Sequence, residues 1–261
     1  MEIIFLGTGP AERIPRLGHN DPTCLDAHQT GSRSRRRRSS ALIVQGNTRL
    51  LFDCGPDIIE QAAIAKLNKA PDAIFLTHGH SDAVGGIADV HKIWNQPVKI
   101  FADAKTIKHT QNRFLINPRE NILWTRLIPG KPVVIKGLKI TPLRVDHAFD
   151  ERITTLGFKI QERLAYISDT RALPITASRA LEGVTTLVID GTQISQLIPT
   201  HLTAEAAIKI GKELGVGQII LTQIGHEYPP YKIAAKKISA LAKKLAAPKT
   251  ILAYDGLTVR L

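Results

Sequence analysis

The segment from Leu76 to Asp82, which reads Leu-Thr-His-Gly-His-Ser-Asp, contains the residues best suited to chemistry. His78 and His80 are separated by one glycine, so both imidazoles can point toward one centre, and the carboxylate of Asp82 can reach it from the far side of the turn. Imidazole suits zinc, manganese and iron, and a carboxylate adds a hard anionic oxygen. The spacing indicates a metal-binding loop, although a His-x-His pair taken alone also fits two solvated histidines.

Three further polar residues stand next to apolar runs elsewhere in the chain. His147 and Asp169 each follow such a run, and His201 precedes Thr203, which is typical of a helix N-cap. Each of the three alone also fits an exposed loop or a turn. Taken with the histidine pair, they place several ligand-type side chains at strand ends on one face, which favours one shared site.

The elements that must position these residues follow from the hydrophobic periodicity. Strands are expected at residues 2–6, 41–44, 49–52, 73–76, 98–101, 121–127, 132–145, 153–161, 164–168, 186–190, 218–222 and 250–253. Helices are expected at residues 58–68, 86–94, 104–114, 203–214 and 231–246. Gly46-Asn47 indicates a hairpin turn, and Asp57 indicates the N-cap of the first helix. This order predicts an α/β protein in which residues 1–261 form a single domain, a four-layer αββα sandwich with helices outside two packed sheets.

The composition limits the class of protein and its surroundings. Apolar residues make up 43% of the chain, which excludes disorder, collagen-like repeats and coiled coil because a packed core can form. Two cysteines cannot build a disulfide framework, and no apolar run approaches the roughly 18 to 20 residues that span a bilayer. The short apolar run at residues 3–6 does not indicate a signal peptide. We therefore expect a cytoplasmic protein with no membrane association.

The chain carries an excess of positive charge, with 35 lysines and arginines against 23 acidic residues and a formal net charge of +12. Such an excess favours anionic partners, so small phosphorylated compounds, nucleotides and nucleic acid are all allowed. Several lysines near the C-terminus follow a helical pattern with alanine and leucine on its other face, which is typical of a solvated helix face. These lysines are Lys236, Lys237, Lys243 and Lys244.

The chain resembles the metallo-β-lactamase superfamily over nearly its whole length. The matching segments are residues 7–9, 51–57, 77–82, 145–147, 166–170 and 221–226. Within the superfamily it is most similar to the branch of the phosphoribosyl cyclic phosphate phosphodiesterase of the carbon–phosphorus lyase pathway, because Arg33–Ser40 matches the arginine-rich stretch of that branch. The resemblance implies a metallo-β-lactamase-like fold and a metal-dependent hydrolase, a phosphodiesterase acting on a small cyclic or nucleotide-type phosphate ester.

The resemblance also implies which residues belong to each of the two metal sites of the family. The first metal site of the family is fully matched, by His78, His80, His147 and Asp169. The second site keeps Asp82 and shares the aspartate of the first, but Ala83 and Gln223 stand where the family has histidines. Alanine has no donor atom and glutamine offers only a neutral carbonyl oxygen, so Gln223 is at best the remnant of a weak second site. One firmly bound divalent ion, zinc or manganese, is therefore expected.

Three more roles follow from the same resemblance. Asp82, freed from ligation, is expected to orient the attacking water or to act as its base. His201 stands where the branch places a residue near the leaving group, so it is the expected general acid. Asp53 is expected to support the ligands from behind.

The arginine run that ends at Arg38 is a candidate for phosphate contact. Consecutive side chains of an extended segment alternate between faces, so Arg35 and Arg37 can point to the same side. Planar guanidinium groups bind phosphate oxygens in pairs, which favours a contact with substrate phosphate. A solvated loop flank fits the same residues equally well.

The loop after the first strand is a candidate for a structural zinc site. The branch holds zinc there with three cysteines and a histidine, and this chain has His19, Asp21 and Cys24 at the corresponding spacing, with His226 as the fourth ligand. All of these side chains bind zinc. A turn at Asp21-Pro22 with Cys24 simply buried is the alternative, and Cys54 is expected to be a core residue.

Two other classes of function stay open beside the phosphodiesterase. A weakened or inactive cleft could serve as a binding module for a phosphorylated ligand or nucleic acid, and the fold also admits hydrolysis of another ester, a thioester or a lactam. A nuclease would need aromatic stacking platforms, which a chain with 5% aromatic residues barely supplies. A homodimer is open as well.

Overall fold

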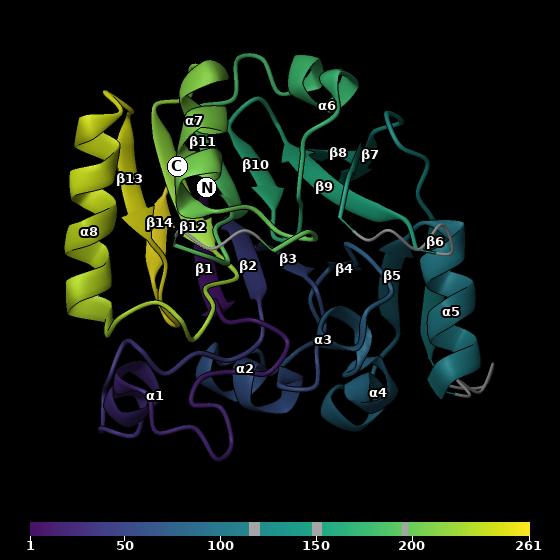
Figure 1. Ribbon diagram of the computed structural model, residues 1–261. Coiled ribbons are helices and arrows are strands. Elements are labelled where there is room, and N and C mark those ends of the chain that lie inside the picture. Colours follow the sequence, from purple (N-terminus) through teal and green to yellow (C-terminus); the bar gives the residue numbers. More distant parts are fainter. Residues whose placement is uncertain (115–120, 148–152, 195–197) are drawn as a thin grey trace.

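The computed structural model describes residues 1–114, 121–147, 153–194 and 198–261, which form two packed sheets of seven strands each (Figure 1). The first sheet contains, in spatial order, β14 (Thr258–Arg260), β1 (Glu2–Gly7), β2 (Ser40–Gln45), β3 (Thr48–Phe52), β4 (Ala73–Phe75), β5 (Val98–Ala102) and β6 (Ile122–Arg126). The second contains β13 (Lys249–Leu252), β12 (Gln218–Thr222), β11 (Thr186–Asp190), β10 (Leu164–Ile167), β9 (Thr155–Ile160), β8 (Leu138–Val145) and β7 (Val133–Ile135).

Helices cover the outer face of each sheet. In chain order the helices are α1 (Pro22–Ala27), α2 (Ile58–Ile64), α3 (Ser81–Val84), the 3-10 helix η1 (Ile87–Asp89), α4 (Val90–Ile93), α5 (Ala104–Phe114), α6 (Ile175–Ala180), α7 (Ala204–Glu213) and α8 (Tyr231–Lys244). Of these, α1 packs on Ile14 in the loop after β1 rather than on a sheet. One apolar cluster joins α2 to α5 with the first sheet, and another joins α6, α7 and α8 with the second. The predicted four-layer αββα sandwich is therefore confirmed. None of the helices in these ranges is both long and apolar enough to cross a bilayer.

Aromatic rings fill the space between the two sheets. The ring of Phe52, at the end of β3, lies 5.3 Å from the rings of Phe158 and Tyr166 in the second sheet, measured between centroids. Phe75 of β4 stacks on Phe52 at the same distance. Such pairs contribute about 0.5 to 1.5 kcal/mol each beyond the burial of apolar area. They hold the two sheets in register beneath the loops that follow β4 and β10.

The structure can be compared with the turn and the helix caps that the sequence predicts. The hairpin turn at Gly46-Asn47 is confirmed, because Gln45 pairs with Thr48. Thr203 caps α7 by accepting a hydrogen bond from the amide of Ala206. Asp57 is the N-cap residue of α2, as predicted, but its side chain makes no capping hydrogen bond, because its carboxylate accepts from the amide and guanidinium of Arg38 instead.

Strand ends from both sheets meet at one edge of the sandwich. β10, β11 and β12 are parallel neighbours, so their carboxyl ends deliver Asp169, Asp190 and Gln223 to the same place. β8 ends two residues before His147, and β4 of the first sheet leads into the loop of His78. The ligand-type residues far apart in the sequence are therefore gathered by the topology of the sheets.

Candidate metal centre

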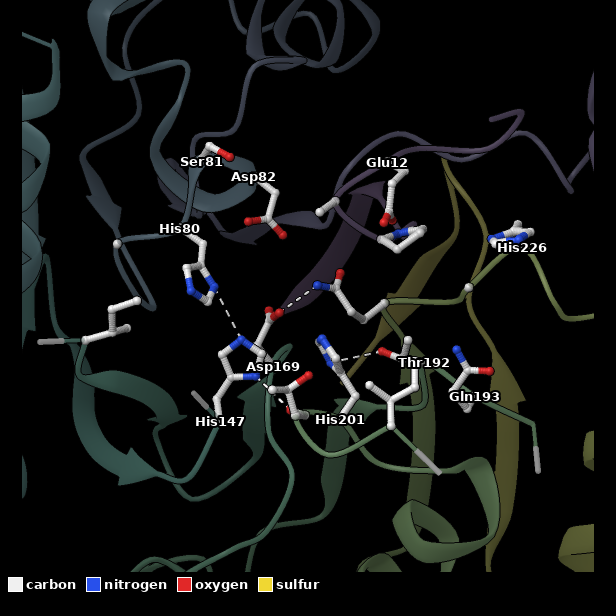
Figure 2. A pocket seen from close by; sticks show the side chains of 18 of the residues that line it. Glu12, His80, Ser81, Asp82, His147, Asp169, Thr192, Gln193, His201 and His226 are labelled. Carbon is white, nitrogen blue, oxygen red and sulfur yellow. Dashed lines mark hydrogen bonds between the residues drawn. The ribbon is translucent and has the colours of Figure 1, made fainter. Parts of the chain in front are cut away.

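Three imidazoles converge at this edge. His78 Nε2 lies 2.9 Å from His80 Nδ1, and His80 Nδ1 lies 3.4 Å from Nε2 of His147, as the dashed line between the last two shows in Figure 2. Two nitrogens that bind one zinc ion at about 2.0 to 2.1 Å are about 2.9 to 3.4 Å apart at bond angles between 90° and the tetrahedral angle. Both distances therefore fall in the range that a shared divalent ion requires, and the ligand atoms of the three residues all lie within 4.8 Å of one another.

Asp53 and Thr77 orient the ring of His78. Asp53 Oδ1 accepts hydrogen bonds from the amide of Thr77 at 2.8 Å and from its hydroxyl at 2.9 Å. Because the hydroxyl proton points to Asp53, the Thr77 oxygen accepts the Nδ1–H of His78 at 2.8 Å, which leaves a lone pair on Nε2. Burial lowers the pKa of His78 to about 3, so its ring is neutral and able to bind a metal. The sequence predicts a supporting role for Asp53, and these hydrogen bonds are the contacts through which it would act.

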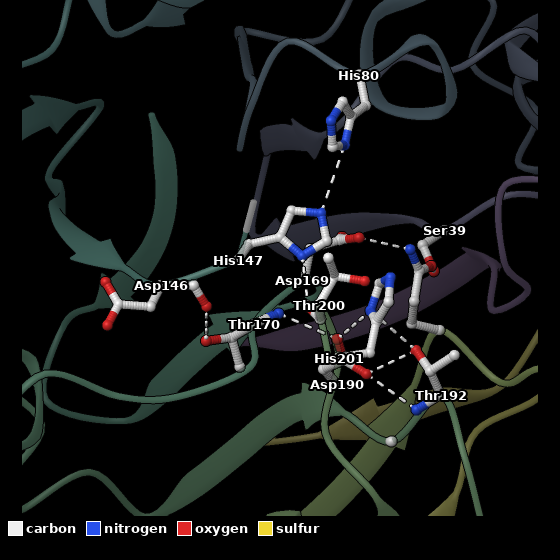
Figure 3. A network of polar contacts seen from close by, with 12 residues as sticks. Ser39, His80, Asp146, His147, Asp169, Thr170, Asp190, Thr192, Thr200 and His201 are labelled. Carbon is white, nitrogen blue, oxygen red and sulfur yellow. Dashed lines mark hydrogen bonds and ion pairs between the residues drawn. The ribbon is translucent and has the colours of Figure 1, made fainter. Parts of the chain in front are cut away.

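The backbone orients His147 in a similar way. Its Nδ1 donates a hydrogen bond to the carbonyl oxygen of Thr200 at 2.8 Å (Figure 3). The proton is therefore on Nδ1, and the lone pair of Nε2 faces His80. His147 also joins a second group of ligand atoms with Asp169 and His201, all within 4.8 Å of one another. Through His147, the structure thus connects Asp169 to the histidine pair.

The side chain of Gln223 is turned differently from what the sequence predicts. Its amide nitrogen donates a hydrogen bond to Asp169 Oδ1 at 2.6 Å, and its amide oxygen accepts from the hydroxyl of Ser39. Since a carboxylate only accepts hydrogen bonds, the nitrogen must be the atom that faces Asp169. The sequence predicts that the amide oxygen of Gln223 is a remnant metal ligand beside Asp169. The geometry does not match this prediction, because the oxygen faces Ser39 and the nitrogen faces Asp169.

Asp82 and Ala83 lie in the first turn of α3, on the other side of the centre. Ala83 is buried and contributes no donor atom, and Asp82 lines the cavity opposite Asp169 (Figure 2). Burial and the negative charge of Asp169 raise the pKa of Asp82 to about 6. Among the described residues, the groups of converging ligand atoms do not include Asp82. Its carboxylate is placed beside the imidazoles rather than among them.

His201 forms a buried pair with Asp190. Its Nδ1 lies 2.6 Å from Asp190 Oδ2 and 3.1 Å from the hydroxyl of Thr192 (Figure 3). Burial lowers the pKa of His201, but the hydrogen bond and the charge of Asp190 outweigh it and raise the pKa to about 9. The ring is therefore cationic at neutral pH, and it lies 4.8 Å from the ring of His147 between centroids.

Asp190 is a site residue that the sequence analysis missed. It ends the buried strand β11, whose letters Leu-Val-Ile-Asp-Gly repeat the pattern that singles out Asp169 after β10. The same strand-then-carboxylate signal was therefore present. Its carboxylate accepts hydrogen bonds from the amides of Thr170 and Thr192 and from His201, so both of its oxygens have hydrogen-bond partners within the protein.

The centre opens into a cavity of about 670 Å³. In Figure 2 the side chains of His80, Asp82, Asp169 and His201 surround its floor, and Glu12 and His226 lie toward one end. A cavity of this volume has room for a ligand considerably larger than a single phosphate group.

The predicted phosphate contacts of Arg35 and Arg37 are wrong in this structure. Arg37 forms ion pairs with Glu60 and with Asp255, the latter at 3.3 Å, and Arg35 donates to the carbonyl oxygen of Ala27 at 3.1 Å. Neither residue is among those of the described chain that line the cavity. The arginine run fastens the N-terminal loop to the rest of the protein, because carboxylates and carbonyls within the fold take up its guanidinium groups.

The loop after β1 brings together part of the predicted structural zinc site. His19, Asp21 and His226 offer ligand atoms within 4.8 Å of one another. Asp21 Oδ1 caps α1 through the amides of Thr23 and Cys24, whereas Asp21 Oδ2 is buried without a hydrogen-bond partner. Cys24 is buried, but its sulfur accepts from the amide of Arg16 at 3.4 Å and is not part of the described ligand group.

Comparisons with known proteins agree with this architecture. The model of the β-lactamase superfamily domain matches residues 48–224. The octanoyltransferase of Porphyromonas gingivalis is 29% identical over 237 residues, which cover 88% of this chain and 47% of that protein. The chain thus spans about half the length of this curated relative.

Solved structures extend the likeness of fold to the whole chain. A diphosphatase from the PhnP family superimposes with a TM-score of 0.86 at 24% identity, covering 100% of this chain and 97% of the other. The zinc-bound PqqB of Methylobacterium extorquens superimposes with a TM-score of 0.84 at 20% identity, covering 100% of each.

Proposed function

The chain belongs to the β-lactamase superfamily domain family, and on that premise we propose that it is a phosphodiesterase that works with one firmly bound divalent metal ion. The superfamily consists mostly of metal-dependent hydrolases. Our proposal goes beyond this by naming a phosphodiester as the substrate. The observation that carries the proposal is the convergence of three imidazoles, of which His78 is held in one tautomer by Asp53–Thr77 and His147 by the backbone of Thr200. His78, His80, His147 and Asp169 would hold the ion.

The donor set favours zinc over manganese. Three neutral imidazoles and one carboxylate match the nitrogen-rich sites of zinc, whereas manganese prefers sites that are rich in oxygen. PqqB of Methylobacterium extorquens, which has the same fold, is zinc-bound. When bound, a divalent ion supplies a Lewis acid that polarises a phosphoryl oxygen and makes nearby water more acidic.

Asp82 and His201 are the groups that would handle protons. Asp82 lines the cavity with a pKa raised to about 6, so at neutral pH it is an ionised base that can orient water and accept its proton. His201 has Nδ1 committed to Asp190, so Nε2 carries the proton that can be donated to a leaving oxygen. The imidazolium also provides positive charge for a phosphate group, which supports a phosphate ester as substrate.

A metal-reconstitution assay tests this function. Protein stripped with a chelator should not hydrolyse bis-p-nitrophenyl phosphate, and zinc or manganese should restore turnover. His80→Ala should lower metal affinity and turnover together, whereas His91→Ala, which changes an exposed histidine of α4, should leave both intact. Turnover that survives complete removal of metal, or a reconstituted enzyme without any phosphodiesterase activity, would contradict the proposal.

Hydrolysis of an acyl thioester is the second candidate, because the Porphyromonas gingivalis relative is named for the transfer of an octanoyl group. The chain spans only about half of that protein, so the name can belong to its other half. Assaying an octanoyl thioester beside the phosphodiester, with the same metal-loaded enzyme, separates the two. Metal-dependent release of octanoate without phosphodiester turnover would favour the thioester.

We further propose that His19, Asp21 and His226 hold a structural zinc ion. The support is the convergence of their ligand atoms and the buried Oδ2 of Asp21, which accepts no hydrogen bond from the described residues and lies 3.8 Å from Nδ1 of His19, so that a cation between them would satisfy it. His19→Ala should reduce bound zinc by one ion per chain and lower the melting temperature of zinc-loaded protein only. An unchanged zinc content in this variant would exclude the site.

A further inference from the structure

Gln193 is a buried residue of the catalytic cavity that the proposed function does not use. It follows β11 by three residues, lines the cavity and is only 5% exposed. Figure 2 shows it next to Thr192, on the side of His226 and away from His80. Its side chain is a neutral amide, so it carries no charge for the metal and no proton for the reaction.

The backbone of Gln193 is held in place by hydrogen bonds to other segments. Its carbonyl oxygen accepts from the amide of Ala204 at 2.7 Å, and its own amide donates to the carbonyl oxygen of Leu202 at 3.4 Å. The hydroxyl of Tyr228 also donates to the carbonyl oxygen of Gln193, at 3.4 Å. The point from which the side chain leaves the backbone is therefore fixed relative to the cavity.

The side-chain amide of Gln193, in contrast, has an oxygen without a partner. Its Oε1 is buried and accepts no hydrogen bond from the described residues. Five side-chain atoms of the described chain are in this state, and Gln193 is the one among their residues that lines the catalytic cavity. A buried amide oxygen without a hydrogen bond destabilises the free protein, and a ligand that donates to it removes this cost.

The chemistry of the amide restricts the kind of group that it can bind. Phosphate and carboxylate have no proton to give to Oε1, so this oxygen selects a neutral group with an N–H donor rather than a further anion. Rotation about the last side-chain torsion, which is only weakly restricted, lets the amide turn its oxygen or its nitrogen toward such a group. The 6-amino group and N7 of adenine offer one donor and one acceptor side by side, and glutamine binds this pair with two hydrogen bonds.

We propose that Gln193 binds the base of an adenine nucleotide substrate. This inference rests on the proposed function and narrows its substrate class to nucleotide-type phosphodiesters whose base carries an amino group. The volume of about 670 Å³ has room for a nucleoside beside the metal centre. Gln193 is thus a specificity residue, and the metal ligands and proton carriers are left unchanged.

Two substrates that differ only in the 6-amino group of the base test this role. Adenosine 2′,3′-cyclic monophosphate is compared with purine riboside 2′,3′-cyclic monophosphate, using metal-loaded enzyme. The native enzyme should prefer the adenosine compound by about tenfold in kcat/KM, which corresponds to about 1.4 kcal/mol. Gln193→Leu should reduce this ratio below about threefold, and Gln193→Glu, which retains an acceptor for the amino group, should keep part of it. Gln29→Leu, the same change at an exposed glutamine outside the cavity, should keep the native ratio.

Calorimetric binding of the same two compounds makes the comparison independent of turnover. A tenfold binding preference that Gln193→Leu abolishes, in a protein that hydrolyses neither compound, would support the base site and contradict the phosphodiesterase. Equal affinity and equal kcat/KM for the two compounds would overturn the base site while leaving the phosphodiesterase intact. A preference that survives in both Gln193→Leu and Gln193→Glu, or a native protein that binds neither compound, would also overturn it.

Discussion

The amide nitrogen of Gln223 donates a hydrogen bond to Oδ1 of Asp169 at 2.6 Å. In the resembling family this carboxylate bridges two metals, and a histidine stands where Gln223 does. Here a neutral donor faces the carboxylate, and Ser39 holds the other end of the amide. The amide of Gln223 thus gives Asp169 a hydrogen bond at the position where the resembling family has a metal-binding histidine.

The double variant Ala83→His/Gln223→His tests this relationship. Two new imidazoles beside Asp82 and Asp169 should complete a second site, so the variant should bind one more divalent ion per chain than the native protein, measured by elemental analysis. The two single variants are the controls and should gain little. An unchanged metal content in a folded double variant would show that restoring these two histidines is not sufficient to form a second metal site.

Asp190→Asn should change the pH dependence of the reaction. Asp190 raises the pKa of His201 to about 9, so the protonated form is present up to that pH. Without the carboxylate charge the pKa falls, and the alkaline limb of kcat/KM against pH should move to lower pH. Thr192→Val removes a neutral contact of the same ring at 3.1 Å and should leave the limb near its native position. A limb that does not move in Asp190→Asn would contradict the role of His201 as acid.

Thr77→Val should weaken metal binding without changing a ligand. The hydroxyl links Asp53 to Nδ1 of His78, and its loss leaves that ring free to turn. Removing such a supporting contact reduces metal affinity about 10- to 100-fold, which competition with a chromogenic chelator can measure. Thr48→Val, a buried change in β3, is the matched control and should keep native affinity. Native affinity in both variants would show that the link is dispensable.

Arg37→Ala should affect stability rather than catalysis. Its guanidinium pairs with Glu60 and with the buried Asp255, so truncation should lower the free energy of unfolding by about 1 to 2 kcal/mol, measured with a denaturant. The value of kcat/KM should stay within about twofold, because the side chain does not reach the cavity. A large loss of kcat/KM at native stability would restore the phosphate contact predicted from the sequence. Arg35→Ala, on an exposed side chain with one hydrogen bond to Ala27, should lower the free energy of unfolding less than Arg37→Ala and leave kcat/KM unchanged.

Strand-end residues were predictable because their signal is local. His147 and Asp169 each follow a short apolar run, and the parallel pairing of neighbouring strands then brings such residues to one edge. The two-sheet sandwich follows from the same alternation of strands and helices. The short strand β14 was not predicted, since its three residues carry almost no periodicity.

The parts that were missed depend on contacts between distant segments. The orientation of Gln223 is set by Ser39, which lies 184 positions earlier in the chain, and no local pattern reports it. The destination of Arg37 depends in the same way on Asp255. The sequence of an arginine run shows that guanidinium groups are present. Whether these groups pair with carboxylates of the protein or with a ligand depends on the fold.

Anomalous diffraction from zinc-loaded crystals tests the central claim most directly. A difference map at the zinc edge should show one strong peak bound by His78 Nε2, His80 Nδ1, His147 Nε2 and a carboxylate oxygen of Asp169, with Gln223 still hydrogen-bonded to that carboxylate. A peak at His19, Asp21 and His226 would be the separate structural site. A second peak of equal height between Asp82 and Asp169, or no peak at the three imidazoles, would contradict the account.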